Sequence, residues 1–230
     1  MINNKLVLTL DTDCGNDEVI EDSINLIIKN GIDKFVVFAT KKFSVFKSLP
    51  SSIEIGIHPY ISCISEGERV ISSLKKSIPS AISLRNHTLF NSAKLFRVYA
   101  NLGIKATSNY LSFFSKNLSP ISLPYEIKEY PIYFMDDAYI LLYTGNDKFT
   151  VDSLNLNSAG LKVLAFHPIH IFLNTENLSR YEKAKSAFRN INELRNFINK
   201  KNKGIKDLFC DVLQYIKENK LRTYTFMELI

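Results

Sequence analysis

The sequence predicts an α/β domain in which parallel strands are joined by helices. Short apolar runs with strand character alternate with longer segments whose apolar residues recur at helical spacing, and such units are typical of parallel strands with helical crossovers. The chain of 230 residues is long enough to bury one core, and its 46% hydrophobic and 23% charged residues are usual for a globular protein. We therefore expect one domain over residues 1–230.

The predicted elements alternate through most of the chain. Strands are expected at residues 5–10, 35–39, 53–57, 81–84, 104–106 and 163–166. Amphipathic helices are expected at residues 17–30, 67–77 and 92–102, the first ended by Gly31 and the third by Gly103. Residues 119–152 hold prolines and tyrosines in short extended pieces, which predicts a loop or hairpin insertion. From residue 175 onward the chain is predicted to be helical, over 178–200 and 204–219.

The net charge of +6 is modest, and much of it lies in residues 195–206. This run carries Lys200, Lys201, Lys203 and Lys206. It suits either a solvated helix end or contact with a phosphate-rich partner, such as a sugar nucleotide or an anionic membrane surface. No nucleic-acid-binding motif accompanies it, so we expect no specific nucleic-acid partner.

The lack of a recognisable signal peptide or membrane span, together with the spacing of the cysteines, predicts a cytoplasmic protein. The first apolar run ends in acidic residues, unlike a signal peptide, and no run of 18 apolar residues suggests a membrane span. The three cysteines are odd in number and form no CxxC pair, which fits reduced thiols. No pattern in the sequence defines an oligomeric state.

All four histidines lie just beyond the end of a predicted strand. They are His58, His87, His167 and His170. Because the carboxyl ends of parallel strands meet at one rim of the sheet, we expect these side chains to converge there with the nearby acidic residues. Histidines and paired carboxylates at one rim favour a metal-dependent hydrolase over isolated structural histidines.

Asp11 and Asp13 follow the first strand and flank Thr12. Side chains two apart on a strand point to the same face, and two neighbouring carboxylates repel each other unless a cation or a proton lies between them. Capping of the following helix is the alternative role for this pair. Arg85 follows another strand and is expected either to orient a carboxylate or to lie on the surface beside a turn.

These residues lie in runs that resemble the motifs of the NodB-type polysaccharide deacetylases. The runs are Leu-Thr-Leu-Asp-Thr-Asp at 8–13, Glu-Ile-Gly-Ile-His-Pro at 54–59, Arg-Asn-His-Thr at 85–88 and Phe-His-Pro-Ile-His at 166–170. The ordered set, over residues 5–175, most resembles the WbmS-like branch found in surface-polysaccharide gene clusters. This resemblance implies a distorted, incomplete (β/α) barrel, with residues 175–230 as a helical C-terminal part.

The resemblance also implies one divalent metal ion, zinc, with Asp13 and His58 as ligands. The family's second motif has two histidines four residues apart, but Ser62 stands where the second is expected. In this register His87 is the third ligand. In the other register His58 matches the second histidine, and Glu54 takes the place of the first.

The remaining roles follow from the same resemblance. Asp11 is the expected general base and His167 the expected general acid, with His170 behind it. Either Asp136 or Asp137 is expected to orient His167 or Arg85, although both acids also suit an exposed turn. The backbone N–H near Thr88 is expected to stabilise the oxyanion.

The predicted activity is removal of an acetyl group from an N-acetylated sugar during polysaccharide or O-antigen precursor biosynthesis. A cytoplasmic protein is expected to act on a nucleotide-linked or lipid-linked sugar, the latter with peripheral membrane contact. Three alternatives remain open. One is a metal hydrolase of another bond, such as a phosphoester, and another is an inactive saccharide-binding domain of the same fold. The third is a nucleic-acid or membrane-surface protein that binds phosphates through residues 200–206.

Overall fold

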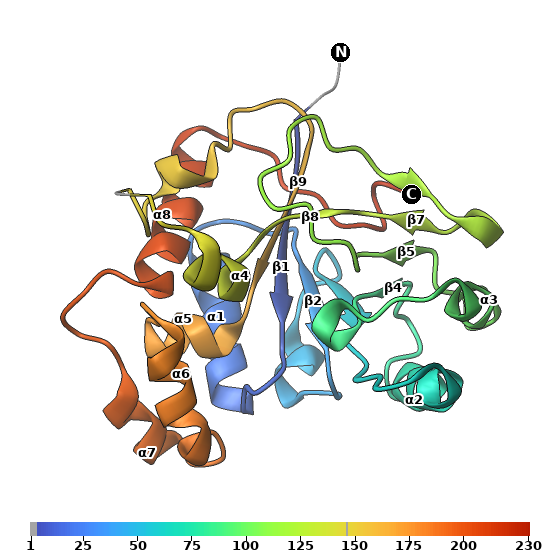
Figure 1. The fold of residues 1–230 in the computed structure, drawn as a ribbon, viewed down its shortest axis with the longest axis horizontal. Helices are drawn as coiled ribbons and strands as arrows, with labels where there is room; N and C mark the ends of the chain where they lie inside the picture. The colour runs from blue at the N-terminus through green and yellow to red at the C-terminus, as the bar shows by residue number, and fades with distance from the viewer. Residues whose placement is uncertain (1–3, 146) are drawn as a thin grey trace.

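The computed structural model describes residues 4–145 and 147–230, and their strands form one sheet in the order β6-β7-β5-β4-β3-β2-β1-β9-β8 (Figure 1). Neighbouring strands are parallel except for the β6–β7 pair. The strands are β1 Lys5–Asp11, β2 Val36–Ala39, β3 Glu54–Ile57, β4 Ser83–Leu84, β5 Ala106–Thr107, β6 Ile121–Ser122, β7 Lys128–Glu129, β8 Ile132–Met135 and β9 Leu161–Phe166. The predicted α/β architecture with parallel strands is confirmed.

The helices pack on one face of the curled sheet, where α1 and α8 share a buried apolar cluster with β1 and α2 and α3 share another with β3 and β4 (Figure 1). The α-helices are α1 Asp17–Lys29, α2 Ile64–Ser77, α3 Ala93–Asn101, α4 Asp136–Leu142, α5 Pro168–Leu173, α6 Leu178–Ala184, α7 Ile191–Leu194 and α8 Ile205–Glu218. Asn16 caps α1, because its side chain accepts a hydrogen bond from the Val19 N–H at 3.0 Å. Helix α1 then buries its apolar stripe against the sheet, and β1 is buried along nearly its whole length.

The sheet curls into a distorted, incomplete (β/α) barrel. Beyond β5, the segment 110–112 runs beside β8, where the Ile132 N–H donates to Tyr110 O and the Ser112 N–H donates to Ile132 O, both at 2.8 Å. Only an isolated bridge between Leu111 and Ile132 joins the two here. An irregular segment therefore stands where a regular barrel has a strand.

The C-terminal segment packs against the end of the barrel at which the parallel strands begin. Phe226 is fully buried, and its ring lies 4.6 Å from that of Tyr130 and 5.9 Å from that of Phe38. The Glu54 carboxylate at the start of β3 accepts a hydrogen bond from the Met227 N–H at 2.8 Å. Glu54 thus belongs to the floor of the barrel.

Two sequence predictions need correction. Residues 119–152 are not simply an insertion: they begin with the predicted hairpin, β6–β7, but β8 pairs in parallel with β9 and is part of the main sheet. All four residues of β8 are buried, so the strand lacks the alternation that would mark it. The expected helix over 178–200 is broken into α6, α7 and the 3-10 turns Lys185–Ala187 and Arg195–Phe197. No helix in the described part of the chain is long and apolar enough to cross a membrane.

Candidate active site

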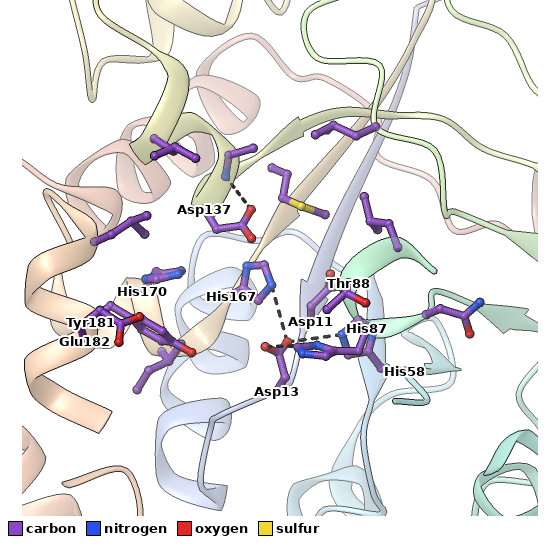
Figure 2. A pocket seen from close by; sticks show the side chains of 18 residues that line it. Asp11, Asp13, His58, His87, Thr88, Asp137, His167, His170, Tyr181 and Glu182 are labelled. Atoms are coloured by element: carbon purple, nitrogen blue, oxygen red, sulfur yellow. Dashed lines mark hydrogen bonds and ion pairs between the residues drawn. The ribbon is translucent and has the colours of Figure 1, made fainter. Parts of the chain in front are cut away.

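A pocket of about 500 Å³ opens at the carboxyl ends of the parallel strands (Figure 2). Eight of the residues predicted to form the site line it: Asp11, Asp13, His58, His87, Thr88, Asp137, His167 and His170. Arg85 and Asp136 are buried just behind it and hydrogen-bond to residues in its wall. The expected convergence of the strand ends is therefore present in the structure.

Asp13 lies at the centre of a group of potential metal ligands. Its Oδ1 is 3.4 Å from Nε2 of His58, and its Oδ2 is 3.7 Å from Nδ1 of His87. The three side chains each offer one ligand atom, and these atoms lie within 4.8 Å of one another. Figure 2 shows Asp13 facing both imidazoles from the loop after β1.

The hydrogen bonds of His58 show that this group suits a cation. Nδ1 of His58 donates to the carbonyl oxygen of Arg85 at 2.7 Å, which leaves a lone pair on Nε2. That buried Nε2 and the buried Oδ1 of Asp13 have no hydrogen-bond partner among the described residues. Two facing acceptors repel each other unless a cation lies between them.

The pKa values of the group fit the same role. Burial by itself raises the pKa of Asp13, but the nearby histidines, His167 foremost, outweigh burial and hold it well below its usual value. Burial lowers the pKa of His87, which favours a neutral imidazole. A carboxylate and neutral imidazoles are the protonation states in which these side chains bind metals.

Of the two candidates for the third ligand, only His87 lies beside Asp13 and His58. Glu54 is at the other end of β3, where its carboxylate contacts the C-terminal segment. The geometry therefore favours the register in which His87 completes the group.

Arg85 holds Asp11 in the wall of the pocket. Its Nη1 donates to Oδ1 of Asp11 at 2.8 Å and to the Thr9 hydroxyl at 2.7 Å, while Nε and Nη2 donate to the backbone and side chain of Ser108. The guanidinium is fully buried and lies 4.5 Å from the ring centre of Phe38. Arg85 is thus not a surface cation.

Asp136 fixes the orientation of His167 through both carboxylate oxygens. Oδ1 accepts from Nδ1 of the imidazole at 2.5 Å, and Oδ2 accepts from the His167 backbone N–H at 2.7 Å. Nε2 of His167 consequently faces Asp13, whose Oδ1 is 3.6 Å away. Burial alone lowers the pKa of His167, but the charges of Asp136 and Asp13 outweigh it and raise that pKa well above its ordinary value.

His170 lies behind His167 and in contact with Tyr181. Its Nδ1 is 3.1 Å from the Thr175 hydroxyl, and its ring centre is 5.6 Å from that of His167 and 4.9 Å from that of Tyr181. Burial lowers the pKa of His170 to about 4, so this imidazole is neutral at neutral pH. A second group of potential metal ligands consists of Asp136, His167 and His170, whose ligand atoms lie within 4.8 Å of one another. In this group both carboxylate oxygens of Asp136 and Nδ1 of His167 already take part in hydrogen bonds.

Asp137 and Thr88 lie on opposite sides of the pocket (Figure 2). Asp137 is the second residue of α4 and lines the pocket, and burial raises its pKa. Thr88 lies in the 3-10 turn His87–Leu89 with φ +58°, an uncommon conformation for a residue other than glycine.

Sequence reasoning missed two parts of the pocket. One is an apolar wall formed by Leu89, Leu111, Met135, Ala138, Leu141, Ile169 and Leu178. The other is the pair Tyr181 and Glu182 on α6. Neither part has a sequence pattern of its own, because the sequence alone does not distinguish apolar residues that line a pocket from those in the core, or a helix face that lines a pocket from one in solvent.

The fold and the site define a hydrolase-like incomplete barrel with Asp–His–His and Asp–His groups at one rim. The chain belongs to the WbmS-like polysaccharide deacetylase family, whose model matches residues 8–185. No curated protein matches the chain.

Solved structures share the fold. A candidate polysaccharide deacetylase of Bordetella bronchiseptica, described as involved in O-antigen biosynthesis, is 24% identical with a TM-score of 0.82, over 92% of this chain and 90% of that one. A candidate polysaccharide deacetylase of Mycobacterium smegmatis is 14% identical with a TM-score of 0.50, over 98% and 95%. The 4-alpha-glucanotransferase of Thermococcus litoralis is 14% identical with a TM-score of 0.51, over 98% of this chain but 38% of that one. The predicted barrel of the NodB deacetylase type is confirmed.

Proposed function

We propose that this protein hydrolyses the acetamido group of an N-acetylated sugar to acetate and a free amine. One observation carries the proposal: the Asp13 group, Asp11 held by Arg85, and His167 held by Asp136 all face one pocket. Family membership supports the deacetylase reaction. We further infer that it acts in the cytoplasm on a precursor of a surface polysaccharide such as O-antigen. The Bordetella neighbour, which is described as involved in O-antigen biosynthesis, supports the polysaccharide class.

Asp13, His58 and His87 would hold one divalent ion, which we propose is zinc, because zinc commonly takes nitrogen and carboxylate ligands. When bound, such an ion lowers the pKa of water and polarises a carbonyl oxygen. The carbonyl of Arg85 keeps the ligand nitrogen of His58 directed at Asp13.

Asp11 is the proposed general base. Its Oδ1 is held by Arg85, and its side chain lines the pocket beside Asp13. A carboxylate so fixed can take the proton from the water that attacks the acetyl carbonyl, a step that typically contributes about 10²- to 10⁴-fold to the rate. Backbone N–H groups near Thr88 are proposed to stabilise the oxyanion.

His167 is the proposed general acid. Cleavage of the C–N bond requires a proton on the departing nitrogen, and the raised pKa of His167 keeps its imidazole protonated at neutral pH. Asp136 directs Nε2 into the pocket by binding Nδ1. We propose that the neutral His170 supports this ring from behind and that Asp137 orients the sugar.

Acetate release from N-acetylated sugars tests the proposal. The wild type is expected to release acetate, and Asp11→Asn is expected to be slower by about 100-fold or more. Asp152→Asn removes an exposed carboxylate outside the pocket and is expected to behave like the wild type. Phosphate release from phosphoester substrates, without acetate release from the sugars, would favour a phosphoester hydrolase. Metal-independent saccharide binding without turnover would favour an inactive binding domain.

A further inference from the structure

A second cavity of about 400 Å³ shares His58 with the active-site pocket. It lies between one face of α2 and the loops that follow β2 and β3. Arg69, Ser73 and Ser77 recur every four residues on that face, and Thr40, Lys41, Pro59 and Tyr60 come from the loops. We call this cavity the α2 groove.

The two cavities differ in their acidic side chains. Carboxyl groups of Asp11, Asp13, Asp137 and Glu182 line the active-site pocket. Among the described residues, no carboxyl group lines the α2 groove, whereas Arg69 and Lys41 do. Arg69 is exposed and forms no ion pair with any residue that the structure describes. The Lys41 ammonium lies 3.6 Å from the Asp17 carboxylate and 4.9 Å from the ring centre of Phe43. A guanidinium without an ion-pair partner, in a groove that also has a lysine and hydroxyl groups, suits a multiply charged oxyanion.

Tyr60 lies at the border between the two cavities. Its side chain is 64% exposed, and its ring centre lies 5.2 Å from that of His87. His87 lines the active-site pocket, whereas Tyr60 lines the groove. Figure 2 shows His58 and His87 on the side of the pocket away from Tyr181 and Glu182. An aromatic face at this border offers a surface for a sugar ring that spans both cavities.

We propose that the α2 groove binds the diphosphate of a 2-acetamido sugar 1-diphosphate, with Arg69 and Lys41 as its cationic contacts. This rests on the proposed deacetylase function. In such a sugar the acetamido group and the diphosphate are attached to adjacent ring carbons. An anion site must therefore adjoin the Asp13 group, as the α2 groove does through His58.

The basic run at residues 200–206 does not serve this role. None of its lysines lines the active-site pocket or the α2 groove. Figure 1 shows the connection between α7 and α8, which carries this run, on the opposite side of the molecule from α2. Arg69 and Lys41 are the cations that line the α2 groove.

Acetate release from three substrates tests the groove: UDP-N-acetylglucosamine, a polyprenyl diphosphate N-acetylglucosamine and a neutral methyl N-acetylglucosaminide. Arg69→Gln is expected to raise KM about tenfold for the diphosphate that is turned over, with little change in kcat and no change for the neutral sugar. Lys76→Gln, an exposed charge on α2 outside the groove, is the matched control. The diphosphate substrate that is turned over identifies the carrier as nucleotide or lipid.

Binding of UDP, measured by calorimetry, separates the inference from the proposed function because it needs no turnover. Wild type and Lys76→Gln are expected to bind UDP, and Arg69→Gln is expected to bind about tenfold more weakly. Equal UDP binding and equal KM in wild type and Arg69→Gln would overturn the proposed diphosphate site in the α2 groove. The proposed deacetylase function would not be affected by that result. Arg69-dependent UDP binding without acetate from any substrate would support the anion site and contradict the deacetylase.

Discussion

The backbone carbonyl of Arg85 accepts a hydrogen bond from Nδ1 of His58 at 2.7 Å, so one residue serves two parts of the site. The guanidinium of the same residue binds Oδ1 of Asp11. The proposed base and a proposed metal ligand are therefore positioned by the side chain and the backbone of Arg85, respectively.

Arg85→Gln separates these two contributions. The substitution keeps the backbone carbonyl but leaves Asp11 without its buried partner, so we expect the metal to be retained and acetate release to fall by about 100-fold or more. Removing one member of a buried ion pair typically costs roughly 3–5 kcal/mol of unfolding free energy. Metal analysis, kinetics and urea unfolding check these outcomes. Loss of the metal together with activity would contradict the division of roles.

Asp136→Asn tests the orientation of His167. The amide is nearly isosteric but donates through its NH₂ group, which disfavours the tautomer with a proton on Nδ1. We expect kcat to fall by about 10³-fold or more while the metal content stays at the wild-type level. Asp147→Asn, which alters a carboxylate outside the pocket, is the control. Wild-type kcat in Asp136→Asn would show that His167 is not the acid.

Measurement of metal content tests whether His87 or Glu54 is the third metal ligand. Purified wild type is expected to hold about one equivalent of zinc, which Asp13→Ala and His87→Ala lose or bind more than about 100-fold more weakly. Glu54→Gln is expected to retain the metal, because Glu54 contacts the C-terminal segment and not Asp13. Loss of zinc in Glu54→Gln but not in His87→Ala would reverse this assignment.

The low pKa of His170 predicts a dependence of stability on pH. The pKa is about 4 in the folded protein and 6.5 as the ordinary value, so the unfolded chain binds the proton more readily between these values. Stability is therefore highest above pH 6.5 and falls as the pH drops, by roughly 2–3 kcal/mol between pH 7 and pH 4.5 from this group alone.

His170→Gln removes this titration. In urea unfolding with a chelator present, the free energy of unfolding of the variant is expected to fall less than that of the wild type between pH 7 and pH 4.5. Parallel losses in both proteins would contradict a buried neutral His170. The chelator keeps metal release from contributing to either curve.

The sequence allowed the position of the site to be predicted, because parallel strands end at one rim and the four histidines follow strand ends. It did not reveal β8, whose buried residues show no alternation. The family resemblance offered Asp136 or Asp137 as the partner of His167 or Arg85, but only the structure selects the pairing of Asp136 with His167, because these residues lie 31 positions apart. The α2 groove was missed for the same reason, since Arg69 and Lys41 come from separate elements that only the folded chain brings together.

The floor of the barrel has a consequence for how the protein is made. Phe226 packs on Tyr130 and Phe38, and the Tyr224 N–H donates to Leu6 O at 2.9 Å. During translation, every residue of the active-site pocket leaves the ribosome before the segment that covers these rings. The nascent barrel must expose that aromatic surface until synthesis has passed Phe226, so we expect chaperones to hold the chain until this segment has been made.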